Sequence, residues 1–305
     1  MLDGKHKSSY LKGMANVLPP EKRALILQMM VEGSSMRSIS RVAGVSINTV
    51  AKLLVDAGEA CLKAHDDLVK DVHAKRVECD EIWSFVHTKE RNKGKAKDFK
   101  PEHGDVWTWT AIEADTKLII SYLAGTRTMI SAEAFLTDLA SRLADRVQID
   151  TDGHAAYVPT IRKVFEGKID HAVITKVYAN VKAEGQKRYA PLECVGVKKK
   201  AECGTPDMRK ASTSYVERQN LSMRMGMRRF TRLTNGHSKK YEQHLYALAL
   251  YFMHYNFCRK HQSLGMTPAM AAGLTDTQHD MAWIVEKIEE NAPPPKKRGP
   301  YKKKA

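Results

Sequence analysis

Apolar residues recur with two different periods along the chain, and the change of period divides it. In the N-terminal part Leu25, Ile26, Met29 and Met30 follow the spacing of one helix face, and Pro20 suits the first position of that helix. Glycine and serine residues then interrupt the pattern. The N-terminal part is therefore expected to be all helical, with helices over residues 20–32, 36–42 and from 47 to 54 or a little beyond.

From residue 75 onwards β-branched and aromatic residues gather in short segments that are typical of strands. The second and third segments are separated by only a short turn, so we expect them to pair antiparallel. Segments with the helical period lie between and after the strands. The pattern predicts an α/β fold with five strands, over residues 76–86, 105–114, 117–124, 146–150 and 171–178, and helices over about 131–143, 158–165, 212–230 and 239–255.

One segment of the helical part, SISRVAGVSINTVAKLL (residues 38–54), has the layout of a helix-turn-helix. Gly44 falls where the tight turn between two helices needs a residue without a Cβ, and Ser46 is placed to cap the second helix. That helix is then free to enter a major groove, and the expected DNA contacts are Ser46, Asn48, Thr49 and Lys52. The alternative is an amphipathic helix pair inside a bundle.

The charge of the chain narrows the class of partner. Its 305 residues include 50 Lys and Arg against 35 Asp and Glu, which leaves a formal net charge of +15. A surplus of this size favours a partner with many phosphates, and we expect double-stranded DNA, although ribosomal and membrane-surface proteins are also basic. Within the basic stretch before residue 211, the candidate DNA contacts are Lys198, Lys199 and Lys200.

Cysteine usage and hydropathy weigh against other classes. The five cysteines form no C-x-x-C pair, which argues against a structural zinc site and against a secreted disulfide framework. Residues 1–14 carry no apolar segment of the kind found in signal peptides, and no run of about 18 apolar residues could cross a membrane. We therefore expect an intracellular protein without a membrane partner.

Three carboxylates stand at positions that suggest a functional role. Asp80 lies in the middle of the first expected strand, among apolar residues. Asp152 follows a short strand at its carboxyl end, and Glu217 lies in the first turns of an expected helix. Taken singly, each acid could be an ordinary surface or turn residue. Asp150, two residues before Asp152, stays open as an alternative second acid, whereas Glu81 points to the other strand face and is not expected to be a ligand.

Three converging carboxylates would repel one another unless cations lie between them. Ligands that are all oxygen select Mg²⁺ or Mn²⁺ over zinc. Two such ions about 4 Å apart could activate an attacking hydroxyl and stabilise the leaving oxygen of a phosphodiester displacement. We therefore expect Asp80, Asp152 and Glu217 to be both metal ligands and catalytic residues, with two bound ions.

Side chains on the same helix as Glu217 are placed to assist it. Asn220, Arg224 and Arg228 follow at spacings that put them on the same helix face, and we expect them to contact DNA. The two guanidinium groups could bind phosphates in a bidentate manner. The alternative for Arg228 is a solvated basic helix face.

The strings DEIWSFV, TDGHAAY and YVERQN, followed by arginines and by HSKKYEQH, resemble the DDE transposases of the IS1 type. The resemblance covers about residues 76–267, and NFCRKHQSLGMTPAMAA is similar to a closing motif of many integrase-type transposases. It implies an RNase H-like core with a mixed five-stranded sheet, in which Asp80, Asp152 and Glu217 are the metal-binding acids. It also implies metal-dependent cleavage and strand transfer of the ends of an insertion sequence, in the cytoplasm of a prokaryote and at its nucleoid.

This interpretation assigns a role to each part of the chain. The expected divisions are a flexible N-terminus (1–18), a helix-turn-helix DNA-binding domain (19–72), an RNase H-like catalytic domain (73–275) with a basic insertion at about 179–211, a C-terminal helix (276–292) and a basic disordered tail (293–305). Transposition requires two DNA ends to be held together, so a homodimer or a higher oligomer on DNA is expected. Two alternatives stay open: a helix-turn-helix regulator with a non-catalytic second domain, and an RNase H-like nuclease without strand transfer.

Overall fold

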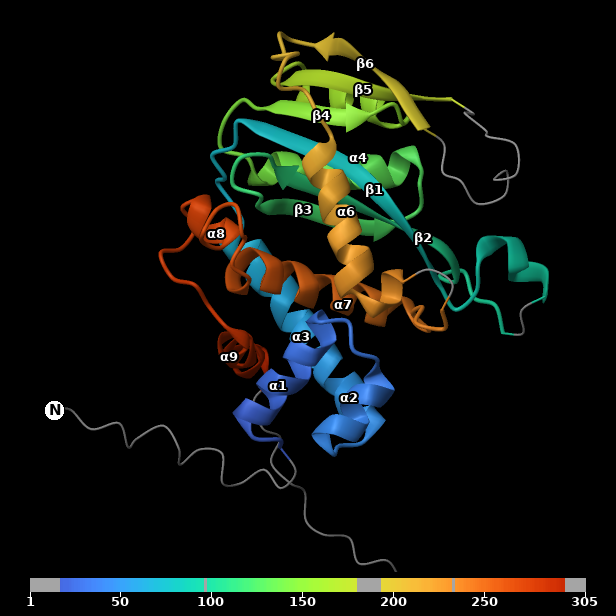
Figure 1. Ribbon diagram of the computed structural model, residues 1–305, viewed down its shortest axis with the longest axis vertical. Coiled ribbons are helices and arrows are strands. Elements are labelled where there is room, and N and C mark those ends of the chain that lie inside the picture. The colour runs from blue at the N-terminus through green and yellow to red at the C-terminus, as the bar shows by residue number, and fades with distance from the viewer. Residues whose placement is uncertain (1–16, 96–97, 180–192, 232–233, 294–305) are drawn as a thin grey trace, which may run out of the picture.

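The computed structural model describes residues 17–95, 98–179, 193–231 and 234–293. Nearly all of the expected flexible N-terminus and basic tail, and part of the expected insertion, lie outside the described residues. Within the described ranges the chain forms one mixed sheet with helices on both of its faces, and further helices that build one end of the molecule (Figure 1).

The sheet contains six strands. They are β1 (Arg76–Val86), β2 (Gly104–Glu113), β3 (Ile119–Gly125), β4 (Gln148–Asp152), β5 (Asp170–Ala179) and β6 (Glu193–Cys203). Their order across the sheet is β3-β2-β1-β4-β5-β6. The expected antiparallel pairing of β2 with β3 is confirmed, β1 also pairs antiparallel with β2, and β1, β4 and β5 run parallel. The parallel pair β1–β4 therefore lies at the centre of the sheet.

The sixth strand corrects two expectations, a five-stranded sheet and an irregular basic insertion over 179–211. β6 takes up residues of that stretch and pairs antiparallel with β5 at the edge of the sheet. Val195 and Val197 supply the alternation of a strand, but the run Lys198–Lys200 hides it in the sequence. Lysines suit an edge strand because they hinder pairing with another chain.

Helices cover both faces of the sheet (Figure 1). The helices are α1 (Pro20–Val31), α2 (Met36–Ala43), α3 (Ile47–Leu68), α4 (Met129–Arg142), α5 (Tyr157–Phe165), α6 (Ser214–Gly226), α7 (Tyr241–Met253), α8 (Pro268–Ala271) and α9 (Met281–Asn291), with short 3-10 or π turns at η1 (Glu90–Lys95), η2 (Arg228–Phe230) and η3 (His254–Cys258). Val77 and Cys79 of β1 share a core with α4 and α5. Ile82 and Val86 share a second core with α6 and α7. The two faces of β1 thus contribute to the two layers.

The segment expected to be a helix-turn-helix forms two helices joined by a tight turn. Gly44 adopts φ +60° and ψ +42°, in the left-handed region, and ends α2. The amide of Thr49 donates a hydrogen bond to the Ser46 hydroxyl at 3.1 Å, which caps α3. The two helices are bent by 111° relative to one another, which lies within the range of such units.

Helix α3 is longer than the sequence pattern predicted. It continues to Leu68 instead of ending near residue 54, because its second half packs against α7 and α9. Gly58 permits this close approach, since a Cβ added there would lie 2.2 Å from the Cβ of Tyr246 on α7. The buried residues of α3 belong to the same apolar core as those of α4 and α5.

No single helix in the described ranges is long and apolar enough to cross a membrane. Only α2 and α3 taken together, across the bend between them, reach the required length and composition.

Candidate active site

Asp80 and Asp152 come together because their strands are parallel neighbours. The register pairs Glu78 of β1 with Asp150 of β4, so the two residues that follow on the same face, Asp80 and Asp152, also lie side by side. Asp152 is the last residue of β4, where the strand gives way to a loop. Carboxyl ends of parallel strands are frequent places for ligand sites in such sheets.

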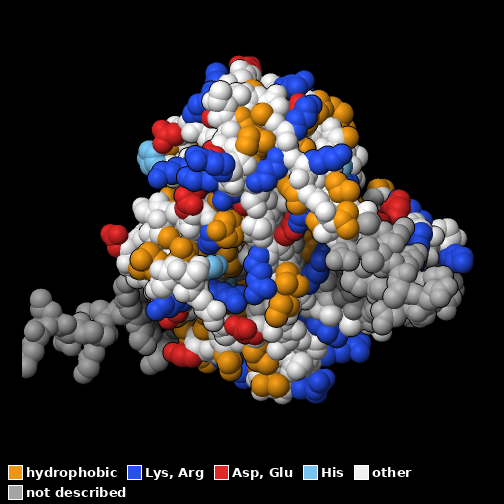
Figure 2. Space-filling view, turned by 45° about the horizontal axis from the view of Figure 1, so that its top comes forward, with side chains coloured by type: hydrophobic (Ala, Val, Ile, Leu, Met, Phe, Trp, Pro, Cys, Tyr) orange, Lys and Arg blue, Asp and Glu red, His pale blue; other side chains and the backbone are white. Residues whose placement is uncertain are grey.

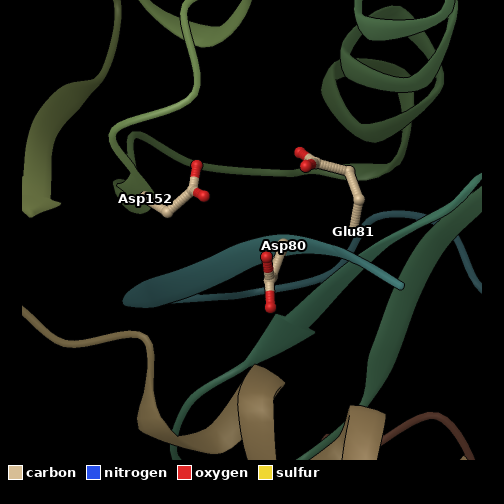
Figure 3. A group of neighbouring side chains, drawn as sticks. All are labelled: Asp80, Glu81 and Asp152. Carbon is tan, nitrogen blue, oxygen red and sulfur yellow. The ribbon is translucent and has the colours of Figure 1, made fainter. Parts of the chain in front are cut away.

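Glu81 adds a third carboxylate to this pair. One oxygen each of Asp80, Glu81 and Asp152 lies within 4.8 Å of the others. Figure 3 shows Asp80 and Glu81 leaving β1 on opposite sides, with Asp152 across from both. The expected direction of Glu81 is thus correct, but its carboxylate nevertheless joins the acidic group.

Asp80 is held from the side of α6. Asn220, which is buried and was expected to contact DNA, donates a hydrogen bond from Nδ2 to Asp80 Oδ2 at 2.8 Å. Burial, together with the charges of Asp152 and Glu217, raises the pKa of the Asp80 carboxyl to about 6. A carboxylate whose pKa is raised by neighbouring carboxylates is stabilised in its charged form when a cation lies between them.

Among the described residues, Glu81 is ion-paired with one cation, Arg127. Arg127 Nε donates to Glu81 Oε2 at 3.1 Å, its Nη2 lies 3.9 Å from Asp152 Oδ2, and its guanidinium lies 4.6 Å from the ring centre of Trp107. Burial raises the pKa of Glu81 to about 7, and the Tyr157 hydroxyl that faces it limits the rise. Neither that hydroxyl nor Glu81 Oε1 makes a hydrogen bond of ordinary geometry with a described residue.

Glu217 lies near the aspartates but outside their group. Thr213 Oγ1 donates a hydrogen bond to Glu217 Oε1 at 2.7 Å, and Lys176 of β5 is ion-paired with Oε2. The charge of Glu217 is close enough to contribute to the raised pKa of Asp80. The structure therefore brings the two expected aspartates together and leaves the expected glutamate beside them, engaged with a lysine.

Asp150 belongs to a different, buried ion pair. Arg76 Nη1 lies 3.2 Å from Asp150 Oδ2 and 2.7 Å from Glu78 Oε1, and both carboxylates are completely buried. Asp150 also accepts a hydrogen bond from Gln148 Nε2 at 2.8 Å. Of the two aspartates that the sequence left open, Asp152 is thus the one in the acidic group.

The same ion pair fixes the start of α6. Glu78 Oε2 accepts hydrogen bonds from the amides of Tyr215 at 2.7 Å and Val216 at 3.1 Å, and the amide of Ser212 donates to Asp150 at 2.9 Å. Carboxylates at a helix N-terminus satisfy its free amides and its dipole. The backbone that carries Glu217 is therefore anchored to β1 and β4.

The expected DNA contacts at the start of α3 differ in availability. Asn48 and Lys52 are exposed, and Lys52 is ion-paired with Asp56 at 2.6 Å. The Ser46 hydroxyl lies 2.9 Å from Thr49 Oγ1 in addition to capping the helix. The two hydroxyls thus stabilise the turn, and the exposed amide and ammonium remain on the surface.

The remaining basic candidates lie on separate surfaces. Lys198–Lys200 are exposed on the edge strand β6, where Lys200 is ion-paired with Glu202. Arg228 is exposed just beyond α6, and Arg224 is partly buried on it. On the face shown in Figure 2, lysine and arginine side chains are spread over both halves of the molecule. The positive charge is therefore not confined to one expected site.

Sequence reasoning set Glu81 aside as a ligand and did not select Arg127 or Lys176 for the site. The position of Glu81 next to Asp80 was the only local signal for it. Arg127 lies in the loop before α4 and Lys176 on β5, and nothing near either residue in the sequence marks it. Their roles depend on contacts between elements that are distant along the chain.

No protein-family model matches the sequence, and no curated protein matches it. Among solved structures the chain is similar to a Mos1 strand transfer complex (14% identity, TM-score 0.21) and to a Mos1 mariner paired-end complex with Mn (13% identity, TM-score 0.21). Each match covers 50% of this chain, and 58% and 59% of the Mos1 chains. A piggyBac transposase synaptic complex with hairpin DNA matches 93% of this chain and 76% of its own, at 9% identity and a TM-score of 0.36.

The structures that the chain resembles are thus complexes of transposases with DNA. At these identities and TM-scores, any assignment of activity rests on the residues of this chain.

Proposed function

We propose that the chain is a DDE-type transposase with an RNase H-like catalytic core. Support comes from the strand order β3-β2-β1-β4-β5, in which an antiparallel meander is followed by two parallel strands, with β6 as an addition at the edge. The observation that carries the proposal is the meeting of Asp80 and Asp152 on adjacent parallel strands, with Glu217 beside them on α6. Acids that converge from separate elements favour cation-dependent chemistry on phosphates.

The residues present fit divalent cations. The acidic group offers only carboxylate oxygens, which Mg²⁺ and Mn²⁺ prefer, and one buried oxygen of Glu81 lacks an ordinary hydrogen bond. When bound, such cations supply Lewis-acid activation of the attacking hydroxyl and stabilisation of the leaving oxygen. The proposed ligands of two ions are Asp80, Asp152 and Glu217, and Glu81 is a further candidate.

The neighbouring residues orient the acids and balance their charge. Asn220 fixes one oxygen of Asp80, and Arg127 partly neutralises Glu81 beside Asp152. Thr213 and Lys176 each engage one oxygen of Glu217, and each oxygen keeps a second lone pair with which it could bind a cation. These neighbours thus hold the acids close to an arrangement that could bind cations.

The rest of the proposal concerns the DNA. The helix-turn-helix would bind the ends of an insertion sequence through Asn48 and Lys52, and the other basic candidates would contact phosphates of the ends or of the target DNA. Two ends must be joined in one reaction, so the proposed active form is a homodimer or a higher oligomer on DNA. The proposed location is the prokaryotic cytoplasm, at the nucleoid.

Strand transfer of a labelled, pre-cleaved element end into plasmid DNA tests the proposal. The wild type should join the end in Mg²⁺ or Mn²⁺, while Asp80→Ala, Asp152→Ala and Glu217→Ala should bind the end and fail to join it. Cleavage without joining by the wild type would favour a nuclease. Binding without any chemistry, in wild type and variants alike, would favour a regulator and contradict the proposal.

A further inference from the structure

A groove of about 810 Å³ separates the N-terminal helices from the connection between α6 and α7. The turn between α1 and α2 and the start of α3 form one wall, and η2 with residues 235–240 forms the other. Residues of α7 complete it. None of the carboxylates of the candidate active site lines this groove, so it is a separate feature of the molecule.

Every charged side chain that lines the groove in the described ranges is basic. Arg37 comes from α2, Arg228 and Arg229 come from η2, and Lys239 and Lys240 precede α7. No aspartate or glutamate stands among these lining residues. A concave surface with cations and no carboxylates concentrates anions, because its walls focus the field.

Arg229 distinguishes the groove from an ordinary basic surface. Its Nη1 donates a hydrogen bond to Ser238 Oγ at 2.9 Å, and no carboxylate in the described part of the chain contacts it. The residue is partly exposed, and desolvation by its neighbours lowers the pKa of its guanidinium to about 10, so the group stays charged at neutral pH. The planar N–H groups of a guanidinium that faces a groove without carboxylates match the oxygens of a phosphate.

The groove also connects the two parts of the molecule that the proposed function requires. Asn48, at the exposed start of α3, is one of its lining residues. On the same side Gly33, with φ +80°, lies so close to the end of α6 that an added Cβ would be 3.0 Å from the carbonyl oxygen of Gly226. A strand of DNA in the groove would therefore lie next to both the proposed recognition helix and the end of the helix that carries Glu217.

We propose that this groove binds a backbone phosphate of the DNA held by the helix-turn-helix, with Arg229 as its central contact and Lys239 and Lys240 at its rim. The identity of the anion as DNA rests on the proposed function, whereas the site itself rests on the groove's shape and charge. A free phosphate or a nucleotide offers the same oxygens, and the test separates these sources.

The test measures how the affinity for duplex DNA depends on salt, with the full chain and in EDTA so that no catalysis occurs. Arg229→Gln removes the charge and keeps a donor for Ser238. Each lost phosphate contact makes the slope of log K against log salt shallower by about 0.9, so this variant should show that change and weaker binding at low salt. The matched control is Lys163→Gln, an equal change of charge at an exposed position on α5, which should keep the wild-type slope.

A second variant covers the case in which Arg229→Gln does not fold. Lys239→Gln with Lys240→Gln alters only exposed side chains and should also flatten the slope. If every variant that folds keeps the wild-type slope of log K against log salt, the proposal is overturned. Because binding is measured without metal, the groove can fail this test while strand transfer succeeds, and the reverse can also occur.

Thermal unfolding in inorganic phosphate or AMP, without DNA, identifies the source of the anion. A ligand that binds only the folded chain raises its melting temperature. A rise in the wild type that Arg229→Gln lacks, combined with unchanged slopes for DNA, would assign the groove to free phosphates and overturn the assignment to DNA. A flattened DNA slope supports the assignment.

Discussion

Two carboxylates compete for the role of third acid beside Asp80 and Asp152. Glu81 is already within 4.8 Å of both but is buried and paired with an arginine, whereas Glu217 lies outside the group and is paired with Lys176. An amide in place of the carboxylate keeps the size of either side chain and removes its charge. The pair of glutamine variants therefore separates the two candidates without creating a cavity.

Glu217→Gln should reduce strand transfer by about 100-fold or more, because the proposed ligand is lost, while Glu81→Gln should reduce it by about 10-fold, as expected for a residue that supports a ligand. The measurement is the rate of joining of a pre-cleaved end over a range of Mn²⁺ concentrations. If Glu81→Gln joins ends more slowly than Glu217→Gln at saturating Mn²⁺, Glu81 is the third acid and the assignment of Glu217 is wrong.

The protonation of the acids also predicts a pH dependence. The pKa of Asp80 is raised to about 6 and that of Glu81 to about 7, mainly by burial, so protons compete with a cation below these values. The affinity for Mn²⁺ should therefore increase between about pH 5 and pH 8, with release of protons on binding. Calorimetric titration in buffers of different ionisation enthalpy measures both quantities. An affinity that does not change over this range would contradict the account.

A chain of buried hydrogen bonds links strands and helices behind the site. His244 of α7 lies with Nε2 3.3 Å from Ser84 Oγ of β1 and with Nδ1 2.9 Å from Ser238 Oγ. Ser84 donates in turn to the carbonyl oxygen of Val106 at 3.0 Å, and Arg229 donates to Ser238. Burial and the charge of Arg229 lower the pKa of His244 to about 3. The folded protein thus keeps this histidine neutral.

His244→Gln should change the pH dependence of stability. The unfolded chain protonates His244 below about pH 6.5, but the folded chain does not do so until about pH 3, so the contribution of this histidine is present above pH 6.5 and is lost as the pH falls. The free energy of unfolding of the wild type should lose about 1.4 kcal/mol per pH unit relative to the variant in this window. Urea unfolding between about pH 6 and pH 4 measures the difference in unfolding free energy between wild type and variant. A difference that stays constant over this range would contradict the prediction.

Sequence patterns predicted those elements whose causes are local. The first strand was predicted with the bounds that the structure gives, Arg76–Val86, and the first helix begins at Pro20 as expected. The second half of α3 was not predicted, because Gly58 and its neighbours are held in a helix by packing against α7. Strand β6 was not predicted, because Lys198–Lys200 interrupt the alternation of apolar and polar residues. In the site, the meeting of Asp80 and Asp152 followed from strand positions, whereas Arg127 depends on a loop that only the fold places.

The N-terminal helices and the sheet share one apolar interior. Ile26 of α1 and Val50 of α3 belong to the same buried cluster as Phe135 of α4, and His65 Nε2 lies 3.1 Å from the carbonyl oxygen of Ile120 on β3. The division of the chain at residue 72 remains an expectation, but no gap in the core marks it. If α3 binds DNA as proposed, a core shared with the sheet would hold that DNA at a fixed distance from the acids.

Gly58→Ala should destabilise the molecule as a whole, because the added Cβ would overlap Tyr246 where α3 crosses α7. We expect the free energy of unfolding to fall by about 1–3 kcal/mol, as for other overpacked cores, in a single transition followed by both circular dichroism and fluorescence. Gly196→Ala, where an added Cβ meets nothing within 4 Å, is the control. Two separate transitions, with only one of them shifted, would show that the N-terminal helices fold independently.

The most direct test of the central claim compares two aspartates on the same strand. Asp152 lies in the acidic group, while Asp150, two residues earlier, is buried against Arg76. Asp152→Asn should keep the wild-type melting temperature and lose metal-dependent strand transfer. Asp150→Asn should melt earlier, because the buried ion pair is broken, and its folded molecules should still join DNA ends, because the asparagine oxygen can accept from the amide of Ser212 and keep the start of α6 in place. Wild-type joining by Asp152→Asn would contradict the assignment of this acidic group as the catalytic centre.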